Sequence, residues 1–269
     1  MRKILVLLIL VVSVNEVWAQ DQAVGPKTRK RFKMGFQVSP SVDFFAPSTD
    51  GVDLHKAKAK FGYGMVAELA FTNNYAFVFG IEHKLAGASL DFKQASVNGE
   101  GARYIPLDDT TRFELQTRLY RFDYVNVPLT LKLMTNEIGY FTYFGQFGAD
   151  ISVLANAKFK DEGNLYSTDS TFVNQTVDFT SRYKHSSFIN VKLRIGVGAE
   201  WNFSGNTSLV FSVSYHNGFI DLMKDANEDR IASDEGLYLD KDTDFKDSTT
   251  PFELIANLHH VALNVGILF

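Results

Sequence analysis

The strict alternation of apolar and polar residues is the feature that most constrains what this chain can fold into. Between residues 34 and 44 every second residue is apolar, as at Phe36, Val38 and Val42, and the residues between them are small or polar. Successive side chains of a β-strand point to opposite faces, so a period of two predicts a strand with one apolar face. The pattern recurs at residues 61–71, 75–85, 125–133, 141–153, 189–203, 209–216 and 261–269, which predicts eight strands in all.

The connections between these strands alternate between short and long. Short connections at residues 72–74, 136–139 and 204–206 are rich in Asn, Gly, Ser and Thr, the chemistry of tight turns. Long connections run over residues 46–60, 93–112, 159–187 and 224–257. Short turns on one side and long loops on the other are typical of outer-membrane barrels. We therefore expect an all-β fold: an eight-stranded antiparallel up-and-down transmembrane β-barrel over residues 33–269, with short periplasmic turns and long extracellular loops.

A soluble lipocalin-like barrel would give the same alternation, but with the apolar face inside. Three features favour the membrane barrel. The polar face carries many Gly and Ser residues, which suit a narrow lumen. The apolar face ends on Phe269, and it is richest in aromatic residues near the short turns, as in an interfacial girdle. Those aromatic residues are Phe71, Tyr75, Phe77, Phe141, Tyr143, Trp201, Phe203 and Phe211.

The N-terminal segment has the pattern of a secretory signal. Arg2 and Lys3 precede an apolar stretch from residue 5 to residue 14, and Ala19 precedes an expected cleavage site. That stretch is much shorter than the ~20 residues of a membrane-spanning helix. We expect a signal peptide over residues 1–19 and a basic periplasmic segment over residues 20–32. A basic run of Lys27, Arg29, Lys30, Arg31 and Lys33 is expected to precede the first strand as a solvated tail.

Composition excludes several function classes. The chain has no cysteine, which excludes disulfides, thiolate metal sites and a lipid-anchored cysteine. Its net charge of -4 implies no general attraction to nucleic acid. No pattern in the sequence calls for a cofactor.

One strand resembles a known family. The segment Tyr124-Val125-Asn126-Val127-Pro128-Leu129-Thr130-Leu131-Lys132 is similar to the "Y-x-x-[IV]-P-L-x-x-K" strand of PorT-like outer-membrane barrels. The segment 196–200 and the strand ending in Phe269 are similar to that family too. The resemblance implies a Bacteroidota-type outer-membrane protein, with Phe269 as the signal for the barrel-assembly machinery and a link to type IX secretion. Independently of the family, Pro128 lacks an amide donor, which predicts a bulge or a local break in pairing.

The polar face of the strands carries a balanced set of charges. Four acids and four bases are expected to face the lumen, and a barrel of eight strands has an interior that side chains fill. Unpaired charges there would be costly, so we expect a closed network of ion pairs. The alternative is a pathway for protons or ions. The eight residues are Glu68, Glu82, Lys84, Lys132, Asp150, Lys192, Arg194 and Glu200.

Two weaker hypotheses concern catalysis and calcium. His83 phases outward near the end of its strand, and with Ser89 or Ser187 it would resemble a lipid hydrolase site at the membrane rim, although the spacing shows no third group to orient the base. In the acidic last loop, Asp225, Asn227 and Asp229 resemble the start of a calcium-binding loop. There, Arg230 replaces the turn glycine and Gly236 the bidentate carboxylate. We expect no catalytic residue and no resident metal.

Three loop tripeptides look like O-glycosylation acceptors of Bacteroidota. They are Asp109-Thr110-Thr111, Asp169-Ser170-Thr171 and Asp247-Ser248-Thr249.

These features favour a non-enzymatic barrel of the cell outer membrane that acts through its loops and rim. The expected partners are outer-membrane lipids, the barrel-assembly machinery and proteins of the envelope or of a secretion complex. A narrow ion or small-solute channel is the alternative function, and a rim lipid hydrolase is the third.

Overall fold

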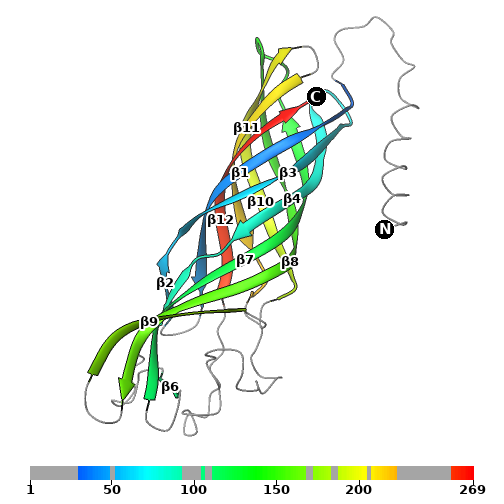
Figure 1. The fold of residues 1–269 in the computed structure, drawn as a ribbon. Helices are drawn as coiled ribbons and strands as arrows, with labels where there is room; N and C mark the ends of the chain where they lie inside the picture. Colours follow the sequence, from blue (N-terminus) through cyan, green and yellow to red (C-terminus); the bar gives the residue numbers. More distant parts are fainter. Residues whose placement is uncertain are drawn as a thin grey trace, which may run out of the picture. The chain divides into compact units, whose positions relative to one another are not determined.

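Eight of the strands form a closed ring in a computed structural model of the chain (Figure 1). The structure describes residues 30–48, 52–92, 104–106, 111–167, 172–182, 187–204, 207–222 and 256–269. The described residues from Arg31 onward belong to one compact unit, Arg31–Phe269. No candidate for a membrane-crossing α-helix occurs among the described residues.

Each strand of the ring pairs antiparallel with its neighbours in sequence, and β1 closes the ring by pairing with β12. Full closure leaves the ring without an exposed edge, and in a bilayer it satisfies the backbone of every strand. The eight expected strands and their up-and-down order are confirmed. The ring consists of β1 (Phe32–Pro47), β3 (Lys58–Ala70), β4 (Tyr75–Ala86), β7 (Thr111–Met134), β8 (Phe141–Ser167), β10 (Ile189–Ser204), β11 (Thr207–Gly218) and β12 (Ala256–Leu268).

The two ends of the barrel differ. At the turn end, Thr72 Oγ1 accepts hydrogen bonds from the amides of Asn74 and Tyr75 at 3.2 and 3.1 Å, which fixes the tight turn between β3 and β4. β1 begins and β12 ends at this same end of the barrel, where Met34 and Phe269 exchange two backbone hydrogen bonds. The opposite end, from which the long connections leave, is the loop end.

The barrel continues past the loop end as a smaller sheet. β7 and β8 stay paired as far as Thr111 and Ser167, and Figure 1 shows them projecting beyond the rest of the ring. Four additional strands join them: β2 (Val52–Lys56), β5 (Ser89–Phe92), β6 (Tyr104–Pro106) and β9 (Phe172–Arg182).

The expectation that residues 93–112 and 159–187 are loops is therefore wrong in part. Those segments contain β6, the first residues of β7, the outer part of β8 and β9. Outside the membrane a strand can be polar on both faces, so the alternation that marks the ring strands is missing there.

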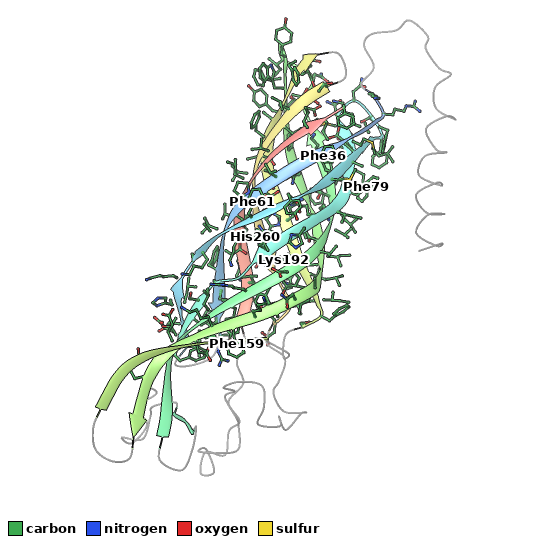
Figure 2. The ribbon with its side chains drawn as sticks, viewed as in Figure 1. Phe36, Phe61, Phe79, Phe159, Lys192 and His260 are labelled. Carbon is green, nitrogen blue, oxygen red and sulfur yellow. The ribbon has the colours of Figure 1, made fainter. Side chains whose placement is uncertain are left out.

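The faces of the ring are as the alternation predicts. Apolar side chains cover the outside, with Val197 67% and Ile81 63% exposed, whereas Lys192 inside is 2% exposed. Figure 2 shows Phe36 and Phe61 on the outer wall and Lys192 and His260 within the ring. A wall that is apolar outside and charged inside fits a lipid environment and excludes the lipocalin-like alternative.

The height of the apolar band can be measured along β7. Its outward residues are apolar from Leu133 to Val125, and then polar at Asp123 and Arg121. Nine residues at about 3.3 Å each, tilted by about 40°, give an apolar band roughly 20 Å tall. That is close to the thickness that barrels present to the hydrocarbon core.

Candidate functional site in the barrel interior

The interior of the barrel is the candidate site, because all eight predicted lumen charges are gathered there. None of the eight is more than 5% exposed. They come from β3, β4, β7, β8 and β10, and the inward phase of each strand places them.

Near the turn end, four charged residues form what we call the turn-side network: Lys33, Glu68, Lys132 and Glu200. The Lys132 ammonium lies 2.6 Å from a Glu68 oxygen and 3.1 Å from a Glu200 oxygen. Lys33 donates to the other oxygen of Glu200, which also accepts a hydrogen bond from Ser208. The two lysines and two glutamates balance, so the charge of the network is zero.

The basic run before the first strand needs a correction at Lys33. This residue is not part of a solvated tail but the second residue of β1, 6% exposed and paired inside the barrel. The physical reason is its phase: Lys33 has the same parity as the inward-facing Ser39 and Asp43 of that strand.

Glu82 lies in the middle of the barrel, surrounded by neutral donors. Its carboxylate accepts hydrogen bonds from Gln37 at 3.1 Å, Ser39 at 2.9 Å and Asn126 at 3.0 Å. Asn126 is held in turn by Ser152 at 2.9 Å. Three hydrogen bonds compensate much of the cost of burying this charge.

A second charged group surrounds Asp150, nearer the loop end. His216 Nδ1 lies 2.6 Å from one oxygen of Asp150, and Arg194 Nε lies 3.7 Å from the other. The His216 ring stacks on His260 with centroids 4.0 Å apart. The network therefore includes two stacked imidazoles as well as the predicted charges.

Lys84 and Lys192 lie at the loop-side margin of this group. Lys84 lies 4.0 Å from Asp43 and donates to Ser41 at 2.5 Å. The Lys192 ammonium lies 5.8 Å from the ring centroid of Tyr124. Both lysines are buried, and the carboxylates of Asp43 and Asp150 supply the opposite charge inside the lumen.

An aromatic cluster closes the lumen at the loop end. Phe45 of β1 meets Tyr120 and Phe122 of β7 edge-on, with centroids 5.6 and 6.5 Å apart. β1 and β7 are not neighbours in the ring, so these contacts cross the lumen. The cluster comprises Phe45, Val52, Ala86, Ala88, Leu90, Phe92, Tyr120, Phe122, Tyr124, Ala157, Phe159, Leu222, Ala256 and Leu258.

Just beyond this cluster lies one further buried ion pair. Arg118 donates to both oxygens of Asp161 at 2.5 and 2.7 Å, and its guanidinium lies 4.4 Å above the centre of the Phe159 ring. The pair connects β7 to β8 beyond the apolar band.

Little space remains inside. Two cavities lie among the described residues of the interior, and each has room for no more than about one or two water molecules. The charged group around Asp150 lines the first cavity. Gln37, Glu82, Pro128 and Arg194 line part of the second cavity. These two cavities of the described interior can hold ordered water.

Sequence reasoning omitted six buried ionisable residues of the interior. Lys33, Asp43, His216 and His260 could have been found from phase alone, because each shares the parity of its strand's inward face. Arg118 and Asp161 lie in segments for which the sequence predicts no strand, so their side chains could not be assigned to an inner or outer face.

The rim residues are not assembled into a hydrolase site. The Nδ1 atom of His83 has no hydrogen-bond partner, and its ring packs against Tyr63 with centroids 5.3 Å apart. Ser187 donates instead to the carbonyl of Ile189 at 2.9 Å, and Ser89 is buried in β5. The structure gives no serine–histidine hydrogen bond at His83.

Several sequence predictions fall outside the described residues. These are the signal peptide, the basic segment before residue 30, the calcium candidates Asp225, Asn227 and Asp229, and the glycosylation tripeptides apart from Thr111, the first residue of β7. Within the described part of the chain, no group of three His, Asp or Glu side chains is arranged to hold a metal ion.

Phe269, the expected barrel-assembly signal, lies on the outer wall at the turn end. It is 45% exposed and is joined to Met34 by two backbone hydrogen bonds of 2.9 and 3.1 Å.

Comparison with known proteins agrees with the closed ring. A family model described as "Outer membrane protein beta-barrel domain" matches residues 18–224. No curated protein matches.

Several solved outer-membrane structures are similar to this chain, at low identity. Neisserial surface protein A has a TM-score of 0.40 and 8% identity, covering 89% of this chain and 96% of its own. The outer membrane protease OmpT from Escherichia coli has a TM-score of 0.44 and 7% identity, covering 93% and 99%. The outer membrane protein OprG from Pseudomonas aeruginosa has a TM-score of 0.39 and 7% identity, covering 90% and 97%.

Proposed function

This chain belongs to the outer membrane protein beta-barrel domain family, and from that premise we propose that it is a closed, non-enzymatic barrel that binds partners through its loop end. It is a protein of the cell outer membrane. Its proposed role is that of a structural or partner-binding component of the envelope.

One contrast carries this proposal: the interior is filled, whereas the loop end is built outward. Paired charges and the aromatic cluster occupy the described interior, and the two cavities among them are water-sized. By contrast, β7 and β8 extend past the ring, with Gln116, Lys158 and Glu162 exposed on the extension. A surface that projects beyond the membrane suits protein contact better than solute passage.

The finer identity is proposed as PorT type, with a link to type IX secretion or to outer-membrane assembly. The support is the strand from Tyr124 to Lys132, where the motif residues have distinct places in the structure. Tyr124 belongs to the aromatic cluster, Pro128 faces the lumen, and Lys132 is the centre of the turn-side network. The motif thus combines three features of the interior in one strand.

Position-specific cross-linking in the cell envelope tests the partner-binding role. A photoreactive amino acid at Gln116, Lys158 or Glu162 should give discrete protein adducts. The same amino acid at Ile138 or Tyr140, which are exposed at the turn end, is the matched control. Adducts only at the turn end, or none at the extension, would contradict the proposal.

The second candidate is a narrow ion or small-solute channel. It is favoured by the charged side chains that line the lumen from the turn end, at Lys33, to the loop side, at Lys84. Recording of the purified protein in planar bilayers separates the two functions. A closed barrel gives no steady conductance, and a channel gives a reproducible one. The third candidate, a rim hydrolase at His83, has less support, because His83 Nδ1 has no hydrogen-bond partner and Ser187 donates to Ile189 instead.

A further inference from the structure

The wall formed by β4, β7 and β8 is irregular in two places. The sequence predicts a bulge or a break at Pro128, and the structure has a break: pairing with β8 runs through Pro128, whereas pairing with β4 stops after Phe79 and resumes at Glu82. The bulge lies nearer the loop end, where Ala155 is an extra residue of β8 opposite β7.

This bulge decides which residues of β8 face outward. Before Ala155, the inward residues of β8 are even-numbered, like Asp150, and after it they are odd-numbered, like Phe159. A bulge of one residue reverses the two faces of the strand that follows it. The exposed Lys158 therefore lies on the outer wall, whereas with the uninterrupted period of β8 it would face the lumen.

The bulge aligns three basic residues on neighbouring strands, which we call the basic row. Lys158 pairs in register with Arg121 of β7 on one side and with Arg182 of β9 on the other. Like charges directly opposite each other destabilise a sheet. Arg121 and Lys158 are both exposed, and neither forms an ion pair with any residue that the structure describes. Their repulsion is therefore not relieved by the described part of the chain.

The acidic residues beside the basic row have other partners. Asp123, two residues from Arg121 on the same face, accepts a hydrogen bond from Asn156 at 3.3 Å. Glu162 accepts one from Lys160 at 3.2 Å. Neither carboxylate is paired with the basic row, so the row remains available to an anion from outside the protein.

The height of the basic row matches that of lipid headgroups. Leu85 of β4 is 39% exposed on the outer wall and lies opposite Asp123, so the apolar wall reaches this level. Arg121 lies two residues farther along β7, which is roughly 5 Å along the membrane normal for a tilted strand. The headgroup layer on each side of the hydrocarbon core is about 5–7 Å thick. The row therefore stands where the phosphate of a lipid would lie.

We propose that the basic row binds a phosphate group of a lipid in the leaflet at the loop end. Arg121 and Lys158 donate to oxygens of one phosphate from neighbouring strands, and its negative charge relieves their repulsion. A phosphorylated lipid suits this place better than an acidic protein segment does, because the row stands on the outer wall just beyond the apolar Leu85. The site lies at the base of the extension, closer to the membrane than Gln116 and Glu162, and it is separate from the proposed protein-binding role.

The test measures binding of diphosphoryl lipid A to the barrel in non-ionic detergent by native mass spectrometry. The double variant Arg121→Gln, Lys158→Gln should weaken binding about tenfold, because both cations that hold the phosphate are lost. The matched control Lys30→Gln, Arg31→Gln removes the same two residue types near the turn end and should change binding by less than about twofold. No loss in the first variant, or an equal loss in the control, would overturn the proposal.

Two further measurements separate the site from the fold and the lipid from free phosphate. Without lipid, Arg121→Gln, Lys158→Gln removes two opposed like charges, so its urea midpoint should be no lower than that of the unchanged protein. A lower midpoint would contradict the unrelieved repulsion on which the proposal rests. Lipid A stripped of both phosphates should bind the unchanged protein no better than intact lipid A binds the double variant. Undiminished binding of the stripped lipid, or displacement of lipid A by millimolar inorganic phosphate, would overturn the assignment to a lipid phosphate.

Discussion

The two ends of the lumen are closed by different chemistry. At the turn end, the turn-side network joins four charges from β1, β3, β7 and β10. At the loop end, the aromatic cluster closes the same cross-section with apolar rings. Ion pairs are directional and fail when one partner is lost, whereas an apolar cluster loses stability in proportion to the volume removed. The stability of the turn end should therefore depend on the charges of its side chains, and that of the loop end on the volume of its side chains.

The largest effect is expected at the centre of the turn-side network. Lys132→Met leaves Glu68 and Glu200 buried with less compensation and should destabilise the folded barrel by about 3–5 kcal/mol. Urea unfolding in detergent micelles, followed by the fluorescence of Trp201, measures this. The double variant Lys132→Met, Glu68→Gln should recover about 1–3 kcal/mol of that loss. Strictly additive effects would show that the two side chains do not interact.

A somewhat smaller effect is expected in the aromatic cluster. Phe122→Ala removes a ring that is 1% exposed and should cost about 3–4 kcal/mol. The variant should still give no conductance in planar bilayers, because the turn-side network continues to close the other end. Steady current from Phe122→Ala alone would mean that the aromatic cluster is the only barrier.

The pair between Arg118 and Asp161 combines both kinds of chemistry and should respond to a change at constant charge. Arg118→Lys keeps the positive charge but loses the two-pronged hydrogen bond and the stacking over Phe159, at a cost of about 1–2 kcal/mol. The same urea titration measures it. A cost below the error of the titration would show that charge alone matters there.

The smallest effect is expected at a surface pair on the extension. Lys160 lies 3.2 Å from Glu162, and their side chains are 28% and 49% exposed. Lys160→Met should change stability by no more than about 1 kcal/mol. It is the matched control for Lys132→Met, since both remove a lysine that is paired with glutamate. A comparable loss in the two variants would argue against burial as the cause.

Most of the ring could be predicted from the sequence. Each strand of a membrane barrel has one face toward lipid and one toward the lumen, so its residues alternate between apolar and polar. Strands such as β3 and β10 have an apolar outer face that can be recognised residue by residue. The same parity correctly assigns residues such as Lys192 and Glu200 to the inner face.

The parts that could not be predicted lie where the alternation ends. The extension of β7 and β8 carries polar residues on both faces, such as the exposed Lys158 and the buried Asp161, so the sequence reveals no strand period there. The partners of each charge also could not be predicted. Lys33 and Glu200 are 167 residues apart, and only the register around the whole ring brings them together.

The closing contact between β1 and β12 has a kinetic consequence. Gly35 pairs with Leu268, so the ring is joined by residues from nearly opposite ends of the barrel sequence. No earlier pairing can substitute for this contact, because every other strand of the ring already has both neighbours. Folding must therefore hold the unpaired edge of β1 available until the final strand arrives, and contacts of such high sequence separation form slowly. The waiting edge is the point at which an assembly factor would shorten the search, and at which an unassisted chain is most exposed to pairing with the wrong strand.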